Sequence, residues 1–576
     1  MPSKWNYLPF TSIQSTIADT LTAQCNTTPV ISQLLAQRGI ESPAQAGAFF
    51  SPSLDDLHDP FLMQDMDKAV NRLNEALGRK ERIMVYGDYD VDGTTAVALV
   101  YRYLLNYYSN IEYYIPTRYE EGYGVSMKSI DTAAQSGVKL IIILDCGIKA
   151  IDEIAYAKQK GIDFIICDHH VPDDELPPAA AILNPKLIDN PYPFKHLSGC
   201  GVGYKLMHAF ALSNGLDINE LQKLLDLVAV SIAADIVPLI GENRVMAHFG
   251  IKRLNSSPNL GLKSIIKICG LTSKELTIND VIFKIGPRIN ASGRMQSGME
   301  AVALLVTKDP ADALEKAKEI DQYNKDRKEL DKRITEEANN ILEQRGNATT
   351  GKKPIVIYNK DWHKGIIGIV ASRLTEIYCR PAVVLTYSNG IVTGSSRSVH
   401  GFDIYKAIDS TRDLLENFGG HTYAVGLSLK EENIPEFSNR FEQYVIDNIS
   451  DEQISQQITV DCDISFSDIT PEFLAQLRMF NPFGPANTKP IFHTSGVYDY
   501  GTSKLVGKQL EHIRLELVDS TSNRIFNGIA FNQARYFEHI KERKPFGICY
   551  TIEENKRLPA KAIQLQIKDI DIESEE

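Results

Sequence analysis

The sequence of 576 residues has only eight cysteines, and none of them belongs to a CxxC pair. Cysteine this sparse in a long chain argues against a disulfide framework and favours reduced thiols. The chain also lacks any run of about 18 uncharged apolar residues, which is the length that a membrane-spanning helix needs. Its first residues, MPSKWNYLPF, lack the basic and then apolar layout of a secretory signal. We therefore expect a cytoplasmic protein without membrane spans.

Basic residues are in deficit, with 61 Lys and Arg against 74 Asp and Glu and a formal net charge of −13. This balance argues against a protein that coats nucleic acid by bulk electrostatics, because neutralising phosphates requires Lys and Arg. It leaves room for a local basic groove beside an acidic site. Hydrophobic residues make up 43% and charged residues 23%, values near those of average globular proteins, so disordered and fibrous classes are excluded.

The chain length predicts several domains in series. Residues from about 80 to 240 alternate short apolar runs with helical patterns, which indicates an α/β fold with a largely parallel sheet. Strands are expected at residues 83–86, 139–144 and 164–167, and a helix at 94–108. Residues 311–343 are rich in helix formers and contain no Pro or Gly, so they predict a long connector helix with a solvated charged face.

A second alternating segment begins at Ile355 and predicts a smaller α/β domain. Beyond it, short strands with turn signals and little helix suggest a small barrel or sandwich, and an OB-type β-barrel is one such shape. The expected domains are a helical lead-in of unknown role (1–75), an α/β catalytic domain with a parallel sheet (76–305), a connector helix (306–346), a second α/β domain (347–450) and an OB-type domain (451–576).

The densest chemical signal is GDYDVDG at residues 87–93, where Asp88, Asp90 and Asp92 alternate directly after an apolar strand. Alternating carboxylates in a tight loop direct several oxygens at one point, and Mg²⁺ and Mn²⁺ prefer oxygen ligands. The alternatives are a Ca²⁺ loop and a solvated acidic turn. An EF-hand loop starting at Asp88 would need Glu at its twelfth position, where Leu99 stands, and a helix rather than a strand before it.

Three more acidic positions follow apolar runs. Asp145 ends the run IIIL, and Asp235 closes the apolar helix LVAVSIAA. Asp168, His169 and His170 follow the run FIIC. Because the ligand crevice of a parallel sheet lies beyond the carboxyl ends of its strands, the strand-end residues should converge. Taken singly, Asp145 is as readily a helix cap, and Asp235 a solvent-facing helix end.

One glycine-rich segment carries no dinucleotide signal. SGCGVGYKL at residues 198–206 follows no clear strand, which a dinucleotide-binding turn requires. We interpret it as the glycine-rich start of a helix.

Together, DxDxDG, a strand-end Asp, DHH and an Asp closing an apolar helix resemble the four metal-binding motifs of the DHH phosphoesterase superfamily. The resemblance implies two Mn²⁺ or Mg²⁺ ions. Carried over by position, one ion takes Asp88, Asp90 and Asp145, and the other takes Asp92, Asp145, His169 and Asp235. Where many members have a His in the first motif, this chain offers Asp88 or Tyr86. The resemblance also places His170 against the substrate phosphate, so the implied catalytic residues are Asp145, His169 and His170.

The segment FGGHTY resembles the GGH motif of the DHH-associated domain and is expected to form a flexible turn. The segments IGPRINASGRM, WHKGIIGIVASRL and TGSSRSVHGFD resemble the RecJ family. The residues expected to bind substrate are Arg288, Ser292, Arg294, His363, Lys364, Arg373, Ser396, Arg397, Gly419, Gly420 and His421. For any single Arg a surface salt bridge explains the sequence equally well, whereas three clusters favour a phosphate track.

The segment MFNPFGPANTKPIF also resembles the RecJ family, in which an OB-type domain follows. OB barrels bind single strands by stacking bases on aromatic side chains. We nevertheless expect Phe480 and Phe483 to be core residues.

The resemblance to the RecJ family implies a 5′ to 3′ exodeoxyribonuclease that acts on single-stranded DNA in recombination and repair. It also implies a RecQ-type helicase and a single-strand-binding protein as partners. The residues alone reach only a two-metal phosphoesterase. Two alternatives stay open, a small-substrate DHH phosphodiesterase acting on cyclic dinucleotides or short oligonucleotides, and a non-catalytic DNA-binding scaffold. The first commonly ends after the GGH domain, and the second would lack metal ligands that this chain has.

Overall fold

The computed structural model describes residues 4–122, 124–346, 351–555 and 562–572. The chain forms two compact units. Unit 1 combines residues 1–57, 238–248 and 456–576, and unit 2 combines residues 58–237 and 249–455. All eight cysteines are free thiols, as expected. The described helices include none with the length and apolar character that a membrane span requires.

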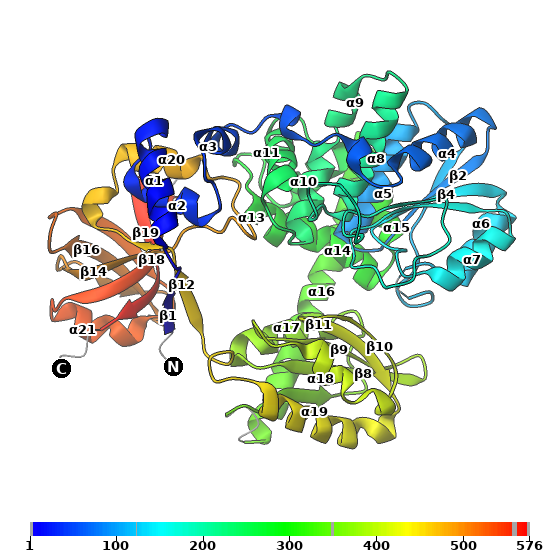
Figure 1. Ribbon diagram of the computed structural model, residues 1–576. Helices are drawn as coiled ribbons and strands as arrows, with labels where there is room; N and C mark the ends of the chain where they lie inside the picture. Colours follow the sequence, from blue (N-terminus) through cyan, green and yellow to red (C-terminus); the bar gives the residue numbers. More distant parts are fainter. Residues whose placement is uncertain (1–3, 123, 347–350, 556–561, 573–576) are drawn as a thin grey trace. The chain divides into compact units, whose positions relative to one another are not determined.

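Unit 2 contains a sheet of parallel strands in the order β3-β2-β4-β5-β6, of which β2 and β4 are labelled in Figure 1. The strands are β2 (Arg82–Gly87), β3 (Ile111–Tyr114), β4 (Val138–Leu144), β5 (Asp163–Cys167) and β6 (Ala181–Leu183). The strands predicted at 83–86, 139–144 and 164–167 are confirmed as β2, β4 and β5, which are apolar and buried along most of their length. Strand β3 gave little signal because it carries Glu and half-buried Tyr, and β6 has only three residues.

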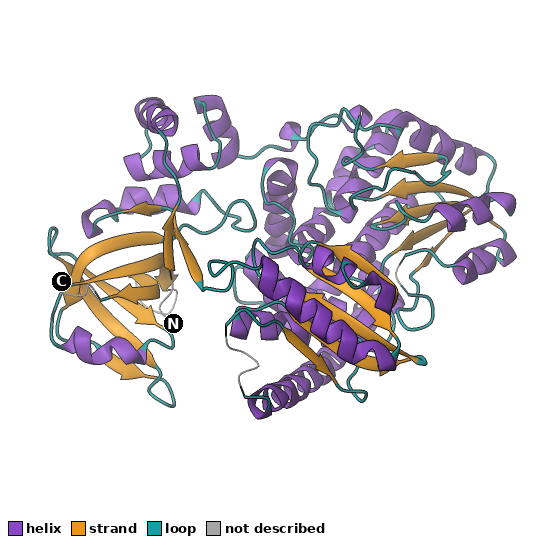
Figure 2. Cartoon of the chain, turned by 60° about the horizontal axis from the view of Figure 1, so that its bottom comes forward, coloured by secondary structure: helices purple, strands orange, loops and turns teal. Residues whose placement is uncertain are grey.

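Helices cover both faces of this parallel sheet (Figure 2). They are α5 (Val91–Leu104), α6 (Met127–Gln135), α7 (Ile151–Gln159) and α8 (Gly199–Ser213). Helices α6 and α7 share an apolar core with Met84, Ile141 and Ile143 on one face. Helix α8 approaches the other face at Leu144, where a side chain on Gly203 would lie 2.9 Å from the leucine methyl.

Further helices of unit 2 lie before the parallel sheet and between it and a long connector. They are α4 (Met66–Gly78), α9 (Ile218–Gln222), α10 (Leu225–Ala234), α12 (Leu260–Ile268), α13 (Ile278–Asp280), α14 (Gly286–Met295) and α15 (Gly298–Val306), while α11 (Gly241–Ser256) has residues in both units. The long helix predicted at 311–343 is confirmed as α16 (Pro310–Gln344). Its start follows capping rules, because the backbone N–H of Ala311 donates to Asp309 Oδ1 at 2.8 Å and Pro310 fills the first turn.

A second sheet of unit 2 has the strand order β10-β11-β9-β8-β7. Its strands are β7 (Ile355–Tyr358), β8 (Ala382–Ser388), β9 (Ile391–Arg397), β10 (Leu415–His421) and β11 (Ala424–Leu429), and its helices are α17 (Ile367–Tyr378), α18 (Ile404–Asp409) and α19 (Ile434–Asn448). The prediction of a turn at Gly419, Gly420 and His421 is wrong, because these residues end β10 and pair with β11. Gly420 is needed there, since a Cβ would lie 2.2 Å from the carbonyl oxygen of Ala424.

Unit 1 contains the β-barrel that the chain's last strands predict. Strands β14, β18, β19, β17 and β16 pair in that order, and β14 also pairs with β16, which closes the barrel. The strands of the unit are β1 (Lys4–Tyr7), β12 (Gln457–Val460), β13 (Cys462–Asp463), β14 (Phe492–Asp499), β15 (Lys504–Val506), β16 (His512–Asp519), β17 (Ile525–Ala530), β18 (Phe546–Asn555) and β19 (Ala562–Asp571). Its helices are α1 (Ser12–Cys25), α2 (Pro29–Gln37), α3 (Pro43–Phe50), α20 (Pro471–Arg478) and α21 (Phe537–Lys541).

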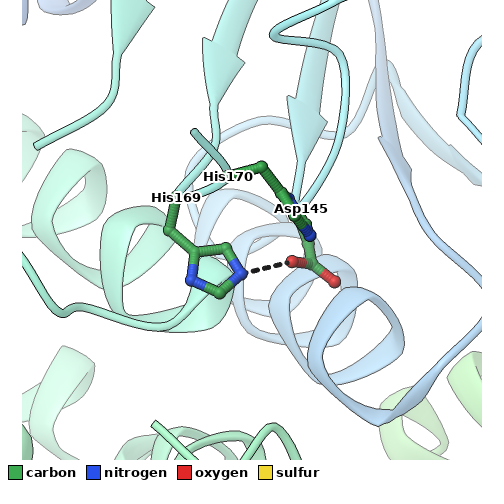
Figure 3. Close-up of side chains that lie close together, drawn as sticks. All are labelled: Asp145, His169 and His170. Carbon is green, nitrogen blue, oxygen red and sulfur yellow. Dashed lines mark ion pairs between the residues drawn. The ribbon is translucent and has the colours of Figure 1, made fainter. Parts of the chain in front are cut away.

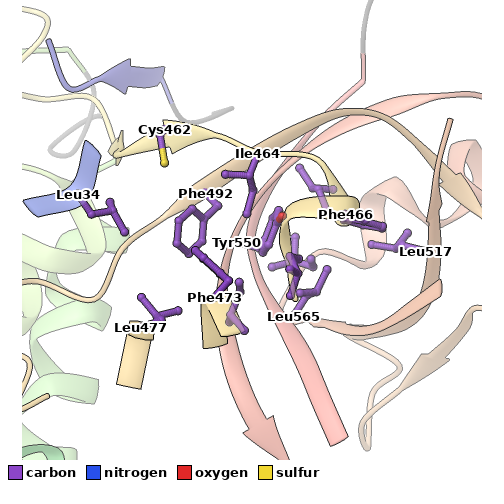
Figure 4. Packing of buried hydrophobic residues seen from close by; sticks show 14 of the residues in the cluster. Leu34, Cys462, Ile464, Phe466, Phe473, Leu477, Phe492, Leu517, Tyr550 and Leu565 are labelled. Atoms are coloured by element: carbon purple, nitrogen blue, oxygen red, sulfur yellow. The ribbon is translucent and has the colours of Figure 1, made fainter. Parts of the chain in front are cut away.

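The first helices of the chain and the barrel share one apolar core (Figure 4). Leu34 from α2 belongs to the same buried cluster as Phe473, Phe492 and Tyr550. Phe480 is also fully buried in this cluster, which confirms it as a core residue. The N-terminal helices, whose role the sequence left open, therefore complete the core of the C-terminal barrel.

The topology of the parallel sheet defines one crevice. From β2 the chain passes to β3 on one side and then to β4 on the other side of β2. In open α/β sheets the ligand crevice lies at such a reversal, outside the carboxyl ends of the strands. The residues that follow β2 and β4 therefore occupy the position where this fold binds ligands.

Candidate metal centre

The carboxylates that follow β2 are held by the first turn of α5. The backbone N–H of Gly93 donates to Asp90 Oδ1 at 3.0 Å, so Asp90 caps the helix and Asp92 lies in its first turn. A side chain on Gly93 would place its Cβ 2.4 Å from the carbonyl oxygen of Asp88, so glycine lets the loop close tightly. The DxDxDG spacing thus brings three carboxylates to one end of the sheet.

Two further acidic residues follow β4 and β5. Asp145 has φ +61°, a conformation that Asp and Asn tolerate better than most residues. Asp168 is fully buried, and its Oδ1 accepts from the backbone N–H groups of His169 at 2.7 Å and His170 at 3.0 Å. The same oxygen lies 2.7 Å from Nδ1 of His170. Asp168, to which the sequence analysis assigns no role, therefore orients the histidine side chain that follows it.

Three predicted carboxylate ligands lie around one imidazole nitrogen of His169. His169 points at Asp145, with His170 beside it (Figure 3). The distances from His169 Nε2 are 3.1 Å to Asp145 Oδ1, 3.6 Å to Asp235 Oδ2 and 3.7 Å to Asp92 Oδ2. Among the described residues, atoms able to bind a metal lie within 4.8 Å of one another in the sets Asp88, Asp90 and Asp145; Asp92, His169 and Asp235; and Asp145, His169 and His170. Asp145 therefore belongs to the first and third sets and lies beside His169 of the second.

Because these buried carboxylates lie close together, a bound cation would stabilise their charged forms. Burial, and then the charge of Asp92, raises the pKa of Asp145 well above its ordinary range. Burial, followed by Asp92 and Asp90, raises the pKa of Asp235 to about 8. The Oδ1 atom of Asp88 is buried and has no hydrogen-bond partner within the described part of the chain. Since carboxylate oxygens with imidazole suit Mn²⁺ and Mg²⁺, the residues fit a divalent cation.

The two adjacent histidines have opposite pKa shifts. Burial lowers the pKa of His169 to about 4, so its ring is neutral at physiological pH, as a metal ligand must be. Burial opposes the charged form of His170 as well, but the hydrogen bond and charge of Asp168 outweigh it and raise the pKa of His170. Although burial alone would raise the pKa of Asp168, its contacts with the two histidines lower that pKa to about 2. His170 is therefore the better hydrogen-bond donor of the pair.

We expect the metal-free protein to lose several degrees of melting temperature as the pH rises from about 6 to about 9. Asp235 has a folded pKa above its unfolded value of about 4, so its contribution to stability is complete below about pH 4 and is lost as the pH rises through about 8. Melting of chelator-treated protein measures this loss, and excess Mn²⁺ should reverse it. The Asp235→Asn variant should melt with a flatter pH dependence, and identical profiles for both proteins would contradict this explanation.

A cluster of cationic side chains adjoins the metal-binding loop. Burial, followed by repulsion from other arginines, lowers the pKa of Arg294 to about 10, and burial followed by Arg118 lowers that of Arg397. Burial and Arg118 also lower the pKa values of His363 and Lys364. The guanidinium of Arg118 lies 5.0 Å from the ring centre of Tyr89, between Asp88 and Asp90 in sequence. Mutually repelling cations of this kind favour a bound anion.

Arg118 is the member of this cluster that the sequence analysis missed. It follows β3, whose carboxyl end lies at the same edge of the sheet as those of β2 and β4. Because β3 has a weak strand signal in the sequence, the residues that follow it are not predicted to lie at a strand end, as Asp145 is. Recognising that strand would have drawn attention to Arg118.

Four other residues predicted to bind substrate have partners within the protein. Arg288 pairs with Asp321 at 2.8 Å, and Arg373 pairs with Asp331 at 2.8 Å, as the salt-bridge interpretation expects. Ser292 donates to the carbonyl of Ile289 at 2.7 Å, and Ser396 donates to that of Val425 at 3.0 Å. Gly419 has open space around the position of a Cβ, and the ring of His421 stacks on that of His170 with centres 6.1 Å apart. His421 is therefore the predicted substrate residue of β10 that reaches the metal cluster.

Comparison with protein families assigns three segments of the chain. Residues 82–232 match the DHH family, N-terminal domain; residues 351–447 match the DHHA1 domain; and residues 460–569 match the RecJ OB domain. These segments contain the parallel sheet, the second sheet and the closed barrel, respectively.

The chain is also similar to characterised proteins over nearly its whole length. It is 37% identical over 552 residues to the single-stranded-DNA-specific exonuclease RecJ of Bacillus subtilis, covering 95% of this chain and 69% of that relative. It is 32% identical over 560 residues to the protein of the same name from Haemophilus influenzae, covering 94% and 96%. The crystal structure of RecJ in complex with Mn²⁺ from Thermus thermophilus superposes with a TM-score of 0.84 at 25% identity, covering 99% of this chain and 80% of that one.

Proposed function

Since the chain belongs to the RecJ family of single-stranded-DNA-specific exonucleases, we propose that it hydrolyses single-stranded DNA from the 5′ end by two-metal catalysis around Asp145. The observation that carries this proposal is the junction of two sets of ligating atoms at Asp145. Two divalent cations bound there supply an activated water and neutralise charge on the scissile phosphate.

We assign the ligands to two adjacent positions. Asp88 and Asp90 would hold one cation, Asp92, His169 and Asp235 would hold the other, and Asp145 would contribute to both. This division follows the grouping of the side-chain atoms and the carboxylate and imidazole chemistry of the donors. No side chain of the cluster has to act as a nucleophile.

His170 is the group that we assign to the scissile phosphate. Its ring is held by Asp168 through a 2.7 Å contact to Nδ1, and this contact orients the ring so that Nε2 can act as the donor to a phosphate oxygen. The stacked ring of His421 approaches from the second sheet, so both sheets of unit 2 contribute to the substrate site.

We assign the cationic cluster of Arg118, Arg294 and Arg397 to the 5′-terminal phosphate. A terminal phosphate carries more negative charge than an internal phosphodiester, so it is the anion that this cluster binds best. Because Arg118 stacks on Tyr89 of the metal-binding loop, a terminal phosphate in the cluster lies near the cleavage site. This arrangement gives 5′ polarity a physical basis.

The Arg397→Ala variant should have a KM about 10- to 100-fold higher for 5′-phosphorylated single strands, with a much smaller change in kcat. This range corresponds to one charge-assisted contact of about 1.5–3 kcal/mol. The salt dependence of binding should become shallower, because one fewer phosphate is neutralised. Arg412, an exposed arginine of the same domain that pairs with Asp409, supplies the control variant Arg412→Ala. Equal effects of the two substitutions would remove Arg397 from the phosphate site.

Several finer assignments stay proposals. We propose domain boundaries after residues 75, 305, 346 and 450. We also propose that the closed barrel binds single-stranded DNA beyond the cleaved nucleotide, since OB-type domains bind single strands by stacking and phosphate contacts. Arg288, Ser292, His363, Lys364, Arg373, Ser396, Gly419 and Gly420 are proposed to border the substrate path. Work in the cytoplasm with a RecQ-type helicase and a single-strand-binding protein is proposed from the family alone.

The decisive assay digests one synthetic single strand labelled separately at each end, in the presence of Mn²⁺ or Mg²⁺. We expect early release of the 5′ label as mononucleotide, shortening of the 3′-labelled strand, and no activity with chelator. A duplex of the same sequence should resist digestion. Early release of the 3′ label, or preference for the duplex, would overturn the proposal.

A further inference from the structure

The Asp92 carboxylate is held by two helices that are distant in sequence. At the start of α8, the backbone N–H of Gly199 donates to Asp92 Oδ2 and that of Cys200 donates to Oδ1, both at 2.7 Å. From α10, the hydroxyl of Ser231 lies 2.7 Å from Oδ1 and donates to it. Asp92 is only 1% exposed, so these protein groups take the place of water around the carboxylate.

Ser231 is unusual in its helix, which otherwise presents almost only apolar side chains to the interior. A buried hydroxyl is unfavourable unless it is hydrogen-bonded. Besides Asp92, Ser231 Oγ lies 2.6 Å from Oγ of Ser198, which accepts from the backbone N–H of Gly201 at 3.1 Å. Because Ser231 has one hydroxyl proton and a carboxylate oxygen accepts it, Ser198 supplies the proton of the second contact. A continuous chain of hydrogen bonds thus connects the cap of α8 to Asp92.

The same helix also presents Asp235 to the cluster. Asp235 follows Ser231 by one helical turn, and its backbone N–H donates to the carbonyl of Ser231 at 2.9 Å, so the two side chains share a face of α10. A carboxylate offers about four lone-pair directions, of which three are used by Gly199, Cys200 and Ser231. The remaining direction belongs to Oδ2, the Asp92 atom that lies 3.7 Å from Nε2 of His169.

We propose that Ser231 is a positioning residue that fixes the ligating oxygen of Asp92 and thereby sets the affinity of the Asp92, His169 and Asp235 set for its divalent cation. The inference rests on the metal-binding function proposed above. It adds that one of the two proposed metal positions depends on Ser231. Ser231 contacts the ligand and not the cation or the DNA. The adjoining set of Asp88 and Asp90 has no part in this chain of hydrogen bonds, so its affinity should be independent of Ser231.

The test measures Mn²⁺ binding to the full-length, DNA-free protein by titration calorimetry. In Ser231→Ala, one site should bind Mn²⁺ about 10- to 100-fold more weakly, the range found when groups that orient metal ligands are removed, while the other site keeps its affinity. Asp92→Asn should remove the weakened site altogether. The matched control is Ser129→Ala, which deletes another buried hydroxyl of the same unit, one that donates to the carbonyl of Ser126.

Kinetics provide a second measurement that a general loss of packing would not imitate. Ser231→Ala should need more Mn²⁺ for half-maximal activity, should recover kcat in excess Mn²⁺, and should keep the KM for DNA. If Ser231→Ala folds poorly, Ser231→Cys keeps the volume and a weak donor, and it should show an intermediate loss of affinity. Two wild-type affinities in either variant would overturn the inference. Absence of Mn²⁺ binding by the unmodified protein would instead overturn the proposed function.

Discussion

Replacing Asp145 with asparagine is expected to lower kcat by at least about 10³-fold, because the substitution removes the carboxylate that we assign to both cations. Positioned cations contribute several kcal/mol to stabilising the transition state, and each 1.36 kcal/mol changes the rate about tenfold. Asparagine is a better replacement than alanine for this test, since asparagine tolerates the left-handed backbone conformation at φ +61°. Single-turnover cleavage of a labelled strand measures the loss.

The same substitution should stabilise the metal-free protein. Burial and four neighbouring carboxylates raise the pKa of Asp145, so ionising it opposes folding at neutral and higher pH. A neutral amide removes this penalty, and the gain in melting temperature should grow as the pH rises above the ordinary carboxylate pKa of about 4. A variant that is more stable and yet inactive distinguishes a metal ligand from a structural residue, whose loss would lower both properties.

Two measurements complete the case for Asp145. The affinity for single-stranded DNA should stay near that of the unmodified protein, because the cationic cluster is untouched. Asp226, a buried carboxylate with raised pKa that lies outside the three sets, gives the control Asp226→Asn, which should retain most activity. Substantial cleavage by Asp145→Asn at saturating Mn²⁺ would contradict the shared-ligand model.

The convergence of the proposed metal ligands could be predicted because it follows from local rules. Parallel strands bring their carboxyl ends to one edge of a sheet, so an acidic residue after each apolar run has a defined neighbourhood. Asp88, Asp145 and His169 were found in this way, and their atoms do meet. The long helix α16 could also be predicted from the sequence, since it depends on composition and capping alone.

What escaped prediction depends on contacts between distant segments. The support of Asp92 by Ser231 joins residues 139 positions apart, and no local pattern marks that serine. The packing of Leu34 with Phe473 in one core is another such contact. The GGH segment was misread for a different reason, because glycine is a turn signal in most contexts. Here Gly420 allows β10 and β11 to approach each other closely as a strand pair.

Gly199→Ala is expected to lower kcat by about 10²-fold or more, although it changes a residue that binds neither metal nor DNA. The sequence suggested only a glycine-rich helix start at this position. In the structure, a Cβ on Gly199 would lie 2.6 Å from Cβ of Asp145 and 2.7 Å from its Oδ1. A shift of about 1 Å in a positioned group is enough to cost 10²-fold in rate.

Gly199→Ala is expected to lower activity because the added methyl group displaces a neighbouring carboxylate. Gly199 is fixed by its hydrogen bond to Asp92, and Asp145 is fixed by the left-handed turn after β4, so the clash displaces one metal ligand or the other. Gly78 of α4 provides the control in the same unit, because its Cβ would have no other atom within 4 Å. Gly78→Ala should keep Mn²⁺ affinity and most of kcat, whereas Gly199→Ala should lose both. Equal behaviour of the two variants would show that α8 does not set the position of the metal ligands.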